Sequence, residues 1–440
     1  MAAQKLFGSS SSARFSSGKH SGDKPQKAGN DTKKKGSRLK PLKITLVVLL
    51  VLEILYCIAI FSNIPFIARL RNMYIETAMS TMSHQWLATA FIPHDIVDEV
   101  VSRTTNAREE QMGQNSTWGD PKNDTTKPTQ PAANTGNKKP EKTLPPEQEK
   151  FFDLFWELDQ SSMLSYVKEN PQVVADGWDK IKINEAGLDD EGTSIRTTMG
   201  EQVLAIDAEN QILLVRVSGS SYRGVLAIAK DPSRMKLAPS EYIGSVGQHA
   251  GEIAEANGGI LAMTGSGFID EGGGGNGGAL AGACMCSGES YGTHYGWGYK
   301  RIELHEDNRL YLTDASDYFG EKTTDAVEFW PALIIDGKNA LGADNIFTEM
   351  NPRACLGQSD KEELLLLVIE GRMASSLGTD AQECVDILLR HHGYQAMNLD
   401  GGTSAIMWYD GEYITKCSNQ SLDAGRYLPN AWVYCDEPVK

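Results

Sequence analysis

The sequence predicts an α+β domain with a single mixed sheet, preceded by one membrane-spanning helix and a helical and disordered stalk. Two observations predict this class. Short β-type runs bounded by turn residues dominate from about Gly192 onward. Helices with their own start and stop signals lie among these runs. Because helices scattered among many strands are typical of one α+β domain, we place that domain at residues 192–440.

The expected strands come from apolar runs of four to eight residues with turn residues between them. The continuous run Leu364–Ile369 is typical of a strand that is buried on both faces. The predicted strands are Gln202–Ile206, Gln211–Val217, Gly224–Ala229, Ala332–Ile335, Leu364–Ile369, Ala405–Tyr409, Tyr413–Lys416 and Ala431–Tyr434.

Two helices are expected where a capping-box pattern precedes apolar residues at helical spacing. The first pattern is Ser245 with Gln248, and the second is Thr379 with Gln382. A glycine is expected to end each helix, at Gly258 and at Gly393.

Charge divides the chain into a basic tail and an acidic body. Residues 1–43 hold eleven Lys and Arg against two Asp, which gives this tail a net charge of about +9. Because the whole chain carries −16, the remaining residues carry about −25. An acidic body repels phosphate backbones, which argues against nucleic acid as a partner. We expect a disordered cytoplasmic tail over residues 1–43, close to an anionic membrane surface.

An apolar segment at residues 44–63 is predicted to cross the membrane as a signal-anchor helix. Its length approaches the roughly 20 residues that span a bilayer, although Glu53 stands at mid-span. The basic flank lies only on the N-terminal side, so the chain after the helix is expected outside the cytoplasm. A cleaved signal peptide, the alternative, wants a shorter and earlier apolar core.

Three segments connect this helix to the domain. Residues 64–103 read as an amphipathic juxtamembrane helical segment, which either lies on the membrane surface or packs on its own protein. Residues 104–147, rich in Asn, Thr, Pro and Lys, are expected to be a disordered linker. Residues 148–191 are expected to form a helical spacer, with membership of the domain itself as the alternative.

The motif Asn398-Leu399-Asp400-Gly401-Gly402-Thr403-Ser404 crowds a carboxylate, an amide and two hydroxyls around two glycines. Glycine lets backbone approach a ligand closely because it has no Cβ. An Asn257-Gly258-Gly259 turn and the glycine-rich stretch around Asp270 form a second such region, whose spacing does not match a P-loop. Guanidinium groups at Arg353, Arg372 and Arg426 suit bidentate contact with phosphate.

These motifs, in this order, resemble those of the phosphodiester glycosidase family. The resemblance runs from about Ile195 to Tyr434 and includes an Asn-Gly-Gly loop, a glycine-rich flap, Asn-Pro-Arg, a carboxylate-Gly-Arg step and a terminal Pro-Asn. The sequence departs from the family pattern at Glu370, where Asp is usual, and also at Ala354 and Thr403.

The resemblance implies hydrolysis of the bond between a sugar and phosphate in sugar-1-phosphodiesters, such as GlcNAc phosphodiesters or a cell-surface phosphoglycan. It implies two carboxylates for the chemistry, and we assign Asp400 and Glu370, with Asp270 as a third candidate. Substrate is expected to contact Arg353, Arg372, Arg426, Asn257, Gly258, Gly259, Gln358, Asn398, Gly401, Gly402, Thr403, Ser404 and Asn430.

Other functions stay open at this stage. A non-catalytic surface protein that binds phosphoglycan or teichoic-type polymers would use the same groups. A nucleophilic hydrolase is disfavoured because the sequence has no GxSxG elbow. No cofactor is predicted, although the Asp and Asn content also suits a structural Ca²⁺. The cysteines show no zinc-like spacing, and Cys417 and Cys435 are either paired or reduced.

Overall fold

The computed structural model describes residues 39–81, 84–119, 144–270, 274–316, 318–342 and 346–439. The chain divides into two compact units, residues 1–58 and 59–440. Most of helix α1 (Leu39–Phe61) belongs to the first unit. Within the described ranges, Pro41–Phe61 is the one helical stretch whose length and composition would allow it to cross a membrane. The predicted tail falls mainly on residues 1–38, which lie outside the described residues.

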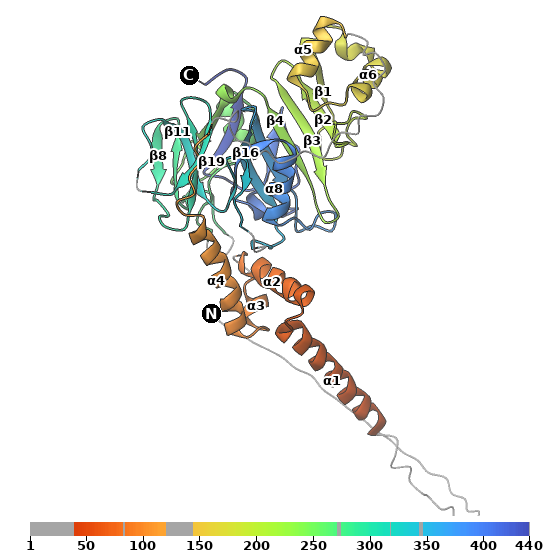
Figure 1. Cartoon of the computed structure of the whole chain (residues 1–440), viewed down its shortest axis with the longest axis vertical. Helices are drawn as coiled ribbons and strands as arrows, with labels where there is room; N and C mark the ends of the chain where they lie inside the picture. The colour runs from red at the N-terminus through yellow and green to blue at the C-terminus, as the bar shows by residue number, and fades with distance from the viewer. Residues whose placement is uncertain are drawn as a thin grey trace, which may run out of the picture. The chain divides into compact units, whose positions relative to one another are not determined.

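The second unit is an α+β fold, which confirms the predicted class, but the prediction of a single mixed sheet is wrong. Its strands form three sheets, and every described ladder is antiparallel. The largest sheet has nine strands and is the one that carries the central site motifs (Figure 1). Its strands, in spatial order, are β1 (Lys182–Asn184), β2 (Gln202–Asp207), β3 (Ile212–Ser218), β4 (Arg223–Ala229), β15 (Leu364–Ile369), β14 (Arg353–Ser359), β16 (Gly393–Asn398), β12 (Ala332–Ile335) and β13 (Lys338–Asn339).

The centre of this sheet brings three distant motifs to one edge. Strand β14 begins at Arg353, opposite the end of β15 at Ile369. Strand β16 ends at Asn398, which pairs with Cys355. Because β14 runs antiparallel to both neighbours, its start and their ends meet at the same edge. Residues of the Asn-Pro-Arg, Glu-Gly-Arg and Asn-Leu-Asp-Gly-Gly motifs are therefore neighbours in space.

Strand β15 is buried on both faces, as the apolar run predicted. Leu364, Leu366 and Val368 join one core cluster, which lies toward the two smaller sheets. The alternate residues join a second cluster with helix α8 (Ala381–Arg390). Two covered faces, rather than a parallel arrangement, thus explain why every position of this strand is apolar.

The two smaller sheets complete the first core. The first consists of β10 (Leu310–Asp314), β9 (Lys300–His305), β11 (Thr323–Phe329), β7 (Ala283–Cys286) and β8 (Glu289–Gly292). The second consists of β18 (Glu412–Tyr413), β17 (Met407–Tyr409), β6 (Gly259–Thr264), β19 (Asn430–Cys435) and β5 (Met235–Pro239), and helix α7 (Ala250–Ala256) packs on it.

Both predicted capping boxes are displaced from the observed helix starts. Helix α7 begins after His249, whose backbone N–H donates to the Glu252 carboxylate at 2.9 Å. Helix α8 is capped by Asp380, which accepts from the Glu383 N–H at 2.9 Å. The prediction at Thr379 is wrong by one residue because the Thr379 backbone is paired with Asn351 instead.

Residues 146–184 differ from the predicted spacer because they share the domain core. Helices α5 (Pro146–Leu154) and α6 (Gln160–Glu169) and the short turns η1 (Pro171–Val174) and η2 (Trp178–Lys180) lead into β1. Phe151, Phe155 and Ile181 pack in the same cluster as α8. The apolar face of this segment alone does not decide between a spacer and a part of the domain, and the packing of these side chains shows that it is part of the domain.

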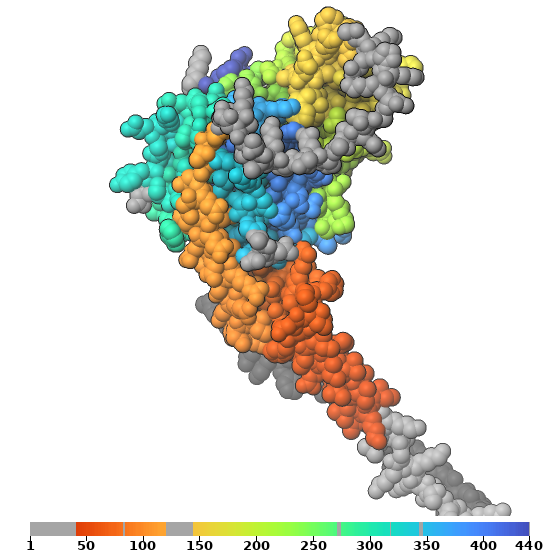
Figure 2. All heavy atoms as spheres, in the orientation of Figure 1, coloured from red at the N-terminus to blue at the C-terminus, as the bar shows by residue number. Residues whose placement is uncertain are grey.

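The segment after the first unit folds into three helices, α2 (Pro65–Met79), α3 (Trp86–Thr89) and α4 (His94–Glu110). They share a small core that includes Ile75, Val97 and Val100. Helix α4 and residues 111–119 extend into the predicted linker and lie against the domain (Figure 2). The buried Gln111 side chain donates to the carbonyls of Ala332 and Ala340 at 3.0 and 2.8 Å. The rest of that linker, residues 120–143, lies outside the described residues.

All seven cysteines are free in the structure. Cys417 and Cys435 are buried, and each thiol faces a backbone carbonyl, of Thr403 and Asn257 respectively. The structure therefore places these two cysteines in the reduced alternative.

Candidate active site

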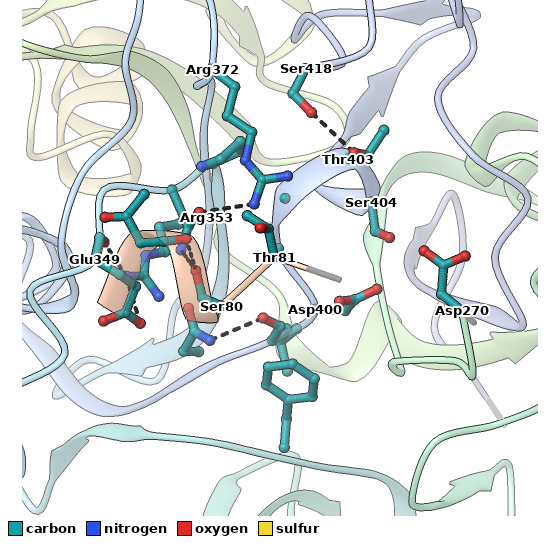
Figure 3. A pocket seen from close by; sticks show the side chains of 18 of the residues that line it. Ser80, Thr81, Asp270, Glu349, Arg353, Arg372, Asp400, Thr403, Ser404 and Ser418 are labelled. Atoms are coloured by element: carbon teal, nitrogen blue, oxygen red, sulfur yellow. Dashed lines mark hydrogen bonds and ion pairs between the residues drawn. The ribbon is translucent and has the colours of Figure 1, made fainter. Parts of the chain in front are cut away.

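A cavity of about 970 Å³ opens at the sheet edge where β14 begins and β15 and β16 end. Several regions of the second unit that are far apart in the sequence line it, and many of the polar side chains converge in Figure 3. The polar and charged lining residues include Thr77, Ser80, Thr81, His84, Asp270, Glu349, Asn351, Arg353, Arg372, Asn398, Asp400, Thr403, Ser404, Ser418, Asn419 and Arg426.

Asp400 occupies the turn directly after β16. The backbone continues through Gly402, at φ +58°, into the short turn η5 (Gly402–Ser404), so a residue with a Cβ would be strained there. Burial raises the pKa of the Asp400 carboxyl to about 6, against the opposing effects of the Ser404 hydroxyl and the Arg426 guanidinium. Asp400 therefore holds a proton at a pH where an ordinary aspartate has lost it.

Asp270 provides the second carboxylate of the cavity. Arg426 grips it with both guanidinium nitrogens, one of them at 3.0 Å, and the Gly275 N–H donates to it at 2.6 Å. Hydrogen bonding from Arg426 holds the pKa of Asp270 below its usual value, whereas the nearby Asp270 charge helps to raise that of Asp400. The two carboxylates, which point toward the same space in Figure 3, thus differ in protonation.

Arg372 presents a cation to the cavity from a left-handed backbone position at φ +59°. Its guanidinium lies over Gly402, where an added Cβ would come within 3.2 Å of Nη1. Nη2 donates to Asn351 Oδ1 at 2.9 Å. Burial lowers the Arg372 pKa and the neighbouring Arg353 charge lowers it further, while Asp400 opposes both effects.

Arg353 is buried at the cavity wall and its donors are engaged internally. Nε donates to the Thr379 carbonyl at 3.1 Å and Nη2 to the Glu349 carbonyl at 2.8 Å. The Glu349 carboxylate pairs with the same guanidinium at 3.1 Å. Arg353 therefore ties the loop before β14 to the start of α8 rather than offering a free fork to a ligand.

Asn398 and the hydroxyls of η5 supply uncharged polar groups. Asn398 is 5 % exposed, and its Nδ2 donates to the carbonyls of Trp330 and Leu399 at 3.0 and 3.1 Å. Its Oδ1 is buried without a partner among the described residues. Such an orphaned oxygen in a cavity wall is suited to accept a hydrogen bond from a ligand.

Glu370, predicted as a catalytic carboxylate, does not line the cavity. It is 3 % exposed, pairs with Arg223 at 3.2 Å and accepts from the Lys416 N–H at 2.9 Å. These partners engage both carboxylate oxygens of Glu370 outside the cavity lining.

Five predicted substrate contacts also lie outside the cavity lining. Asn257 closes the C-terminus of α7, Gly258 follows it at φ +68°, and Gly259 opens β6. Gln358 is fully buried and bonds Leu310, Asn308 and Glu362. Asn430 accepts from the Ser266 N–H at 2.7 Å, and so anchors the loop that leads to Asp270.

None of the predicted site residues lies in the juxtamembrane segment, yet the structure places cavity-lining residues there. Thr77, Ser80, Thr81 and His84, together with apolar neighbours, form one wall of the cavity. The signal available in the sequence was the polar run Ser80-Thr81-Met82-Ser83-His84, which interrupts an apolar helical pattern. Within the parts of the chain described, no group of three or more His, Cys, Asp or Glu side chains is placed to hold a metal ion. A structural Ca²⁺ stays a prediction.

Comparison with known proteins shows a match to one family over part of the chain. The sequence model of the family named phosphodiester glycosidase matches this chain over the stretch that contains both carboxylates and all three arginines. Residues 253–435 match the phosphodiester glycosidase family. The predicted resemblance is thereby confirmed for that part of the chain. No curated protein sequence matches the chain at a significant level.

Solved structures with a similar arrangement include relatives of low identity. The catalytic domain of zebrafish N-acetylglucosamine-1-phosphodiester α-N-acetylglucosaminidase, auto-inhibited by its pro-peptide, is 15% identical over 51% of this chain and 82% of its own, with a TM-score of 0.43. A hypothetical protein from Synechocystis is 12% identical over 53% and 63%, with a TM-score of 0.36. A Burkholderia pseudomallei protein described as exported is 13% identical over 49% and 74%, with a TM-score of 0.38.

Proposed function

We propose that this chain is a membrane-anchored, extracytoplasmic glycoside hydrolase that cleaves the sugar–phosphate bond of sugar-1-phosphodiesters. The substrate would be of the GlcNAc-phosphodiester type or a cell-surface phosphoglycan. One observation carries the proposal: two carboxylates with opposite pKa shifts share a cavity with Arg372 and Arg426. Carboxylates whose surroundings drive their pKa values apart are typical of paired acid and base roles.

The two accessible guanidinium groups would bind the phosphate. Arg372 has one donor committed to Asn351, which leaves others for a ligand. The Arg426 guanidinium donates hydrogen bonds to the Asp270 carboxylate and to the Gly275 carbonyl. Cations held in place before the reaction stabilise the negative charge that develops on a leaving phosphate oxygen.

Asp400 is the proposed proton donor. With a pKa of about 6, it keeps its proton up to about that pH and can pass it to the oxygen between sugar and phosphorus. Asp270, ionised beside Arg426, would stabilise positive charge on the sugar ring or orient the attacking water. The unpartnered Asn398 oxygen and the Thr403 and Ser404 hydroxyls would bind sugar hydroxyls.

Membrane attachment is part of the proposal. Helix α1 is long and apolar enough to span a bilayer, and the basic residues of the tail precede it. The excess of Lys and Arg on that side supports a cytoplasmic tail and an extracytoplasmic second unit.

The test is a turnover assay on the purified full-length chain in detergent, with a GlcNAc-1-phosphodiester as substrate. Asp400→Asn keeps the size of the side chain but cannot donate the same proton, so we expect turnover to fall by at least about 10²-fold. Asp176→Asn, at an exposed position outside the cavity, is the matched control and should behave as the parent.

Two results would contradict parts of this proposal. Equal turnover by the parent and Asp400→Asn would remove Asp400 from the mechanism. A parent without turnover that still binds phosphoglycan in a salt-sensitive manner would select the non-catalytic binding function instead.

A further inference from the structure

One wall of the cavity comes from outside the family region. Tyr74, Thr77 and Ala78 of α2 and Ser80, Thr81, His84 and Leu87 after it line the same space as Asp400 and Arg372. In Figure 3 Ser80 and Thr81 stand beside the arginines. These residues lie more than 150 positions before the start of the matched region at residue 253.

Three polar contacts fasten this wall to the short loop before β14. The Glu76 carboxylate accepts from the Thr348 N–H and hydroxyl at 2.7 and 2.5 Å. The Met350 N–H donates to Thr77 Oγ1 at 3.1 Å. Asn351 Nδ2 donates to Ser80 Oγ at 3.0 Å. The contacts follow one another along both segments, so the helix end and the loop are docked in register.

The last contact leads directly to a cation of the site. Asn351 donates to Ser80 with its amide nitrogen and accepts from Arg372 Nη2 with its amide oxygen, at 2.9 Å. The Ser80 hydroxyl in turn donates to the Thr77 carbonyl at 2.9 Å, which fixes its acceptor direction. The Asn351 backbone is held separately by Thr379, so the Ser80 bond governs the orientation of the side-chain amide.

Arg372 depends on such support because Asn351 is the hydrogen-bond partner that holds its long side chain at the cavity. It sits at φ +59°, in a segment where Gly371 and Gly378 pack against the Asn351–Pro352 backbone. A long side chain with a fixed partner loses less freedom when it binds a ligand. An amide that faces the wrong way would present a donor to the guanidinium and repel it.

We propose that Ser80 is a positioning residue for phosphate recognition: acting through Asn351, it aims the Arg372 guanidinium into the cavity. The juxtamembrane segment then contributes to phosphate binding, in addition to connecting the apolar helix to the domain. This inference rests on the proposed function for the identity of the ligand, and on the hydrogen bonds from Ser80 through Asn351 to Arg372 for the relay itself.

The experiment compares Ser80→Ala with the parent as full-length chains in detergent. We expect KM for the phosphodiester to rise about three- to tenfold with kcat nearly unchanged, as for the loss of one hydrogen bond that orients a binding group. Ser102→Ala is the matched control, because the Ser102 hydroxyl is exposed on α4 and bonds only the Asp98 carbonyl of its own helix. It should retain the parent KM.

A second measurement separates positioning from structural damage and from failure of the proposed reaction. The dissociation constant for inorganic phosphate, measured by calorimetry, should rise for Ser80→Ala by a similar factor. In an Arg372→Ala background, Ser80→Ala should then add nothing further. An unchanged phosphate affinity in Ser80→Ala, or an equal loss in both backgrounds, overturns the relay. A parent that binds phosphate in this pattern without turnover overturns the proposed reaction alone.

Discussion

Single carboxylates decide what this cavity can do. Asp400 and Glu370 each follow a buried strand of the central sheet, yet only Asp400 reaches the cavity. The sequence predicted Asp400 because glycines on its C-terminal side allow close backbone approach. It ranked Glu370 above Asp270, whereas Asp270 lines the cavity and Glu370 does not, because Glu370 pairs with Arg223 and accepts from the Lys416 N–H.

The raised pKa of Asp400 makes a prediction about stability. A carboxyl whose pKa is higher in the folded than in the unfolded chain binds its proton more tightly when folded. Stability should therefore fall as pH rises from about 4, the unfolded value, to about 6, the folded value. Asp400→Asn lacks this titration and should be more stable than the parent at pH 7.5 by about 1–2 kcal/mol, a figure reduced for partial solvent screening.

Thermal unfolding midpoints of both proteins at pH 4 and pH 7.5 test this. The two should differ little at pH 4, where the carboxyl is protonated in the folded chain and about half protonated in the unfolded chain. A variant that is less stable than the parent at pH 7.5 would mean that the Asp400 charge is well solvated or paired, contrary to the account.

At the scale of elements, periodicity located the central strands and helices but not their ends. The run Leu364–Ile369 was read correctly because its apolar content needs two covered faces. The observed helix starts differ from the predicted ones because a residue whose backbone is already paired does not cap the helix. Thr379, for example, is paired with Asn351, and Asp380 caps α8 instead. The short strand β1 was not predicted because an alternation over only three residues is too short to indicate a strand.

The cap of α8 gives a direct test at this scale. Asp380→Ala removes the acceptor for the Glu383 N–H and should cost about 1 kcal/mol in the free energy of unfolding, measured with urea. Gln382→Ala is the control, since the sequence pattern gave that residue a capping role whereas the structure places it in contacts with Asn339 and Asp386. A larger cost at Gln382 than at Asp380 would favour the capping box predicted from the sequence.

At the scale of the whole molecule, composition predicted the order of tail, apolar helix, juxtamembrane helices and domain. It did not predict that the juxtamembrane helices would line the cavity. That outcome depends on long-range contacts, such as Glu76 with Thr348 and Gln111 with Ala332, that no local pattern encodes. Likewise, residues 146–184 join the core through packing of Phe151 and Phe155 rather than through any motif.

The central claim is that guanidinium groups make this site select a phosphate. The most direct measurement compares kcat/KM for a GlcNAc-1-phosphodiester and for an uncharged aryl glycoside of the same sugar, in the parent, in Arg372→Ala and in the exposed control Arg103→Ala. We predict that the parent and control prefer the phosphodiester by at least about 10²-fold, because charge-assisted contacts to phosphate each contribute about 1.5–3 kcal/mol. Arg372→Ala should lose most of that preference. Equal activity of the parent on both substrates, or a preference that survives in Arg372→Ala, would contradict the account.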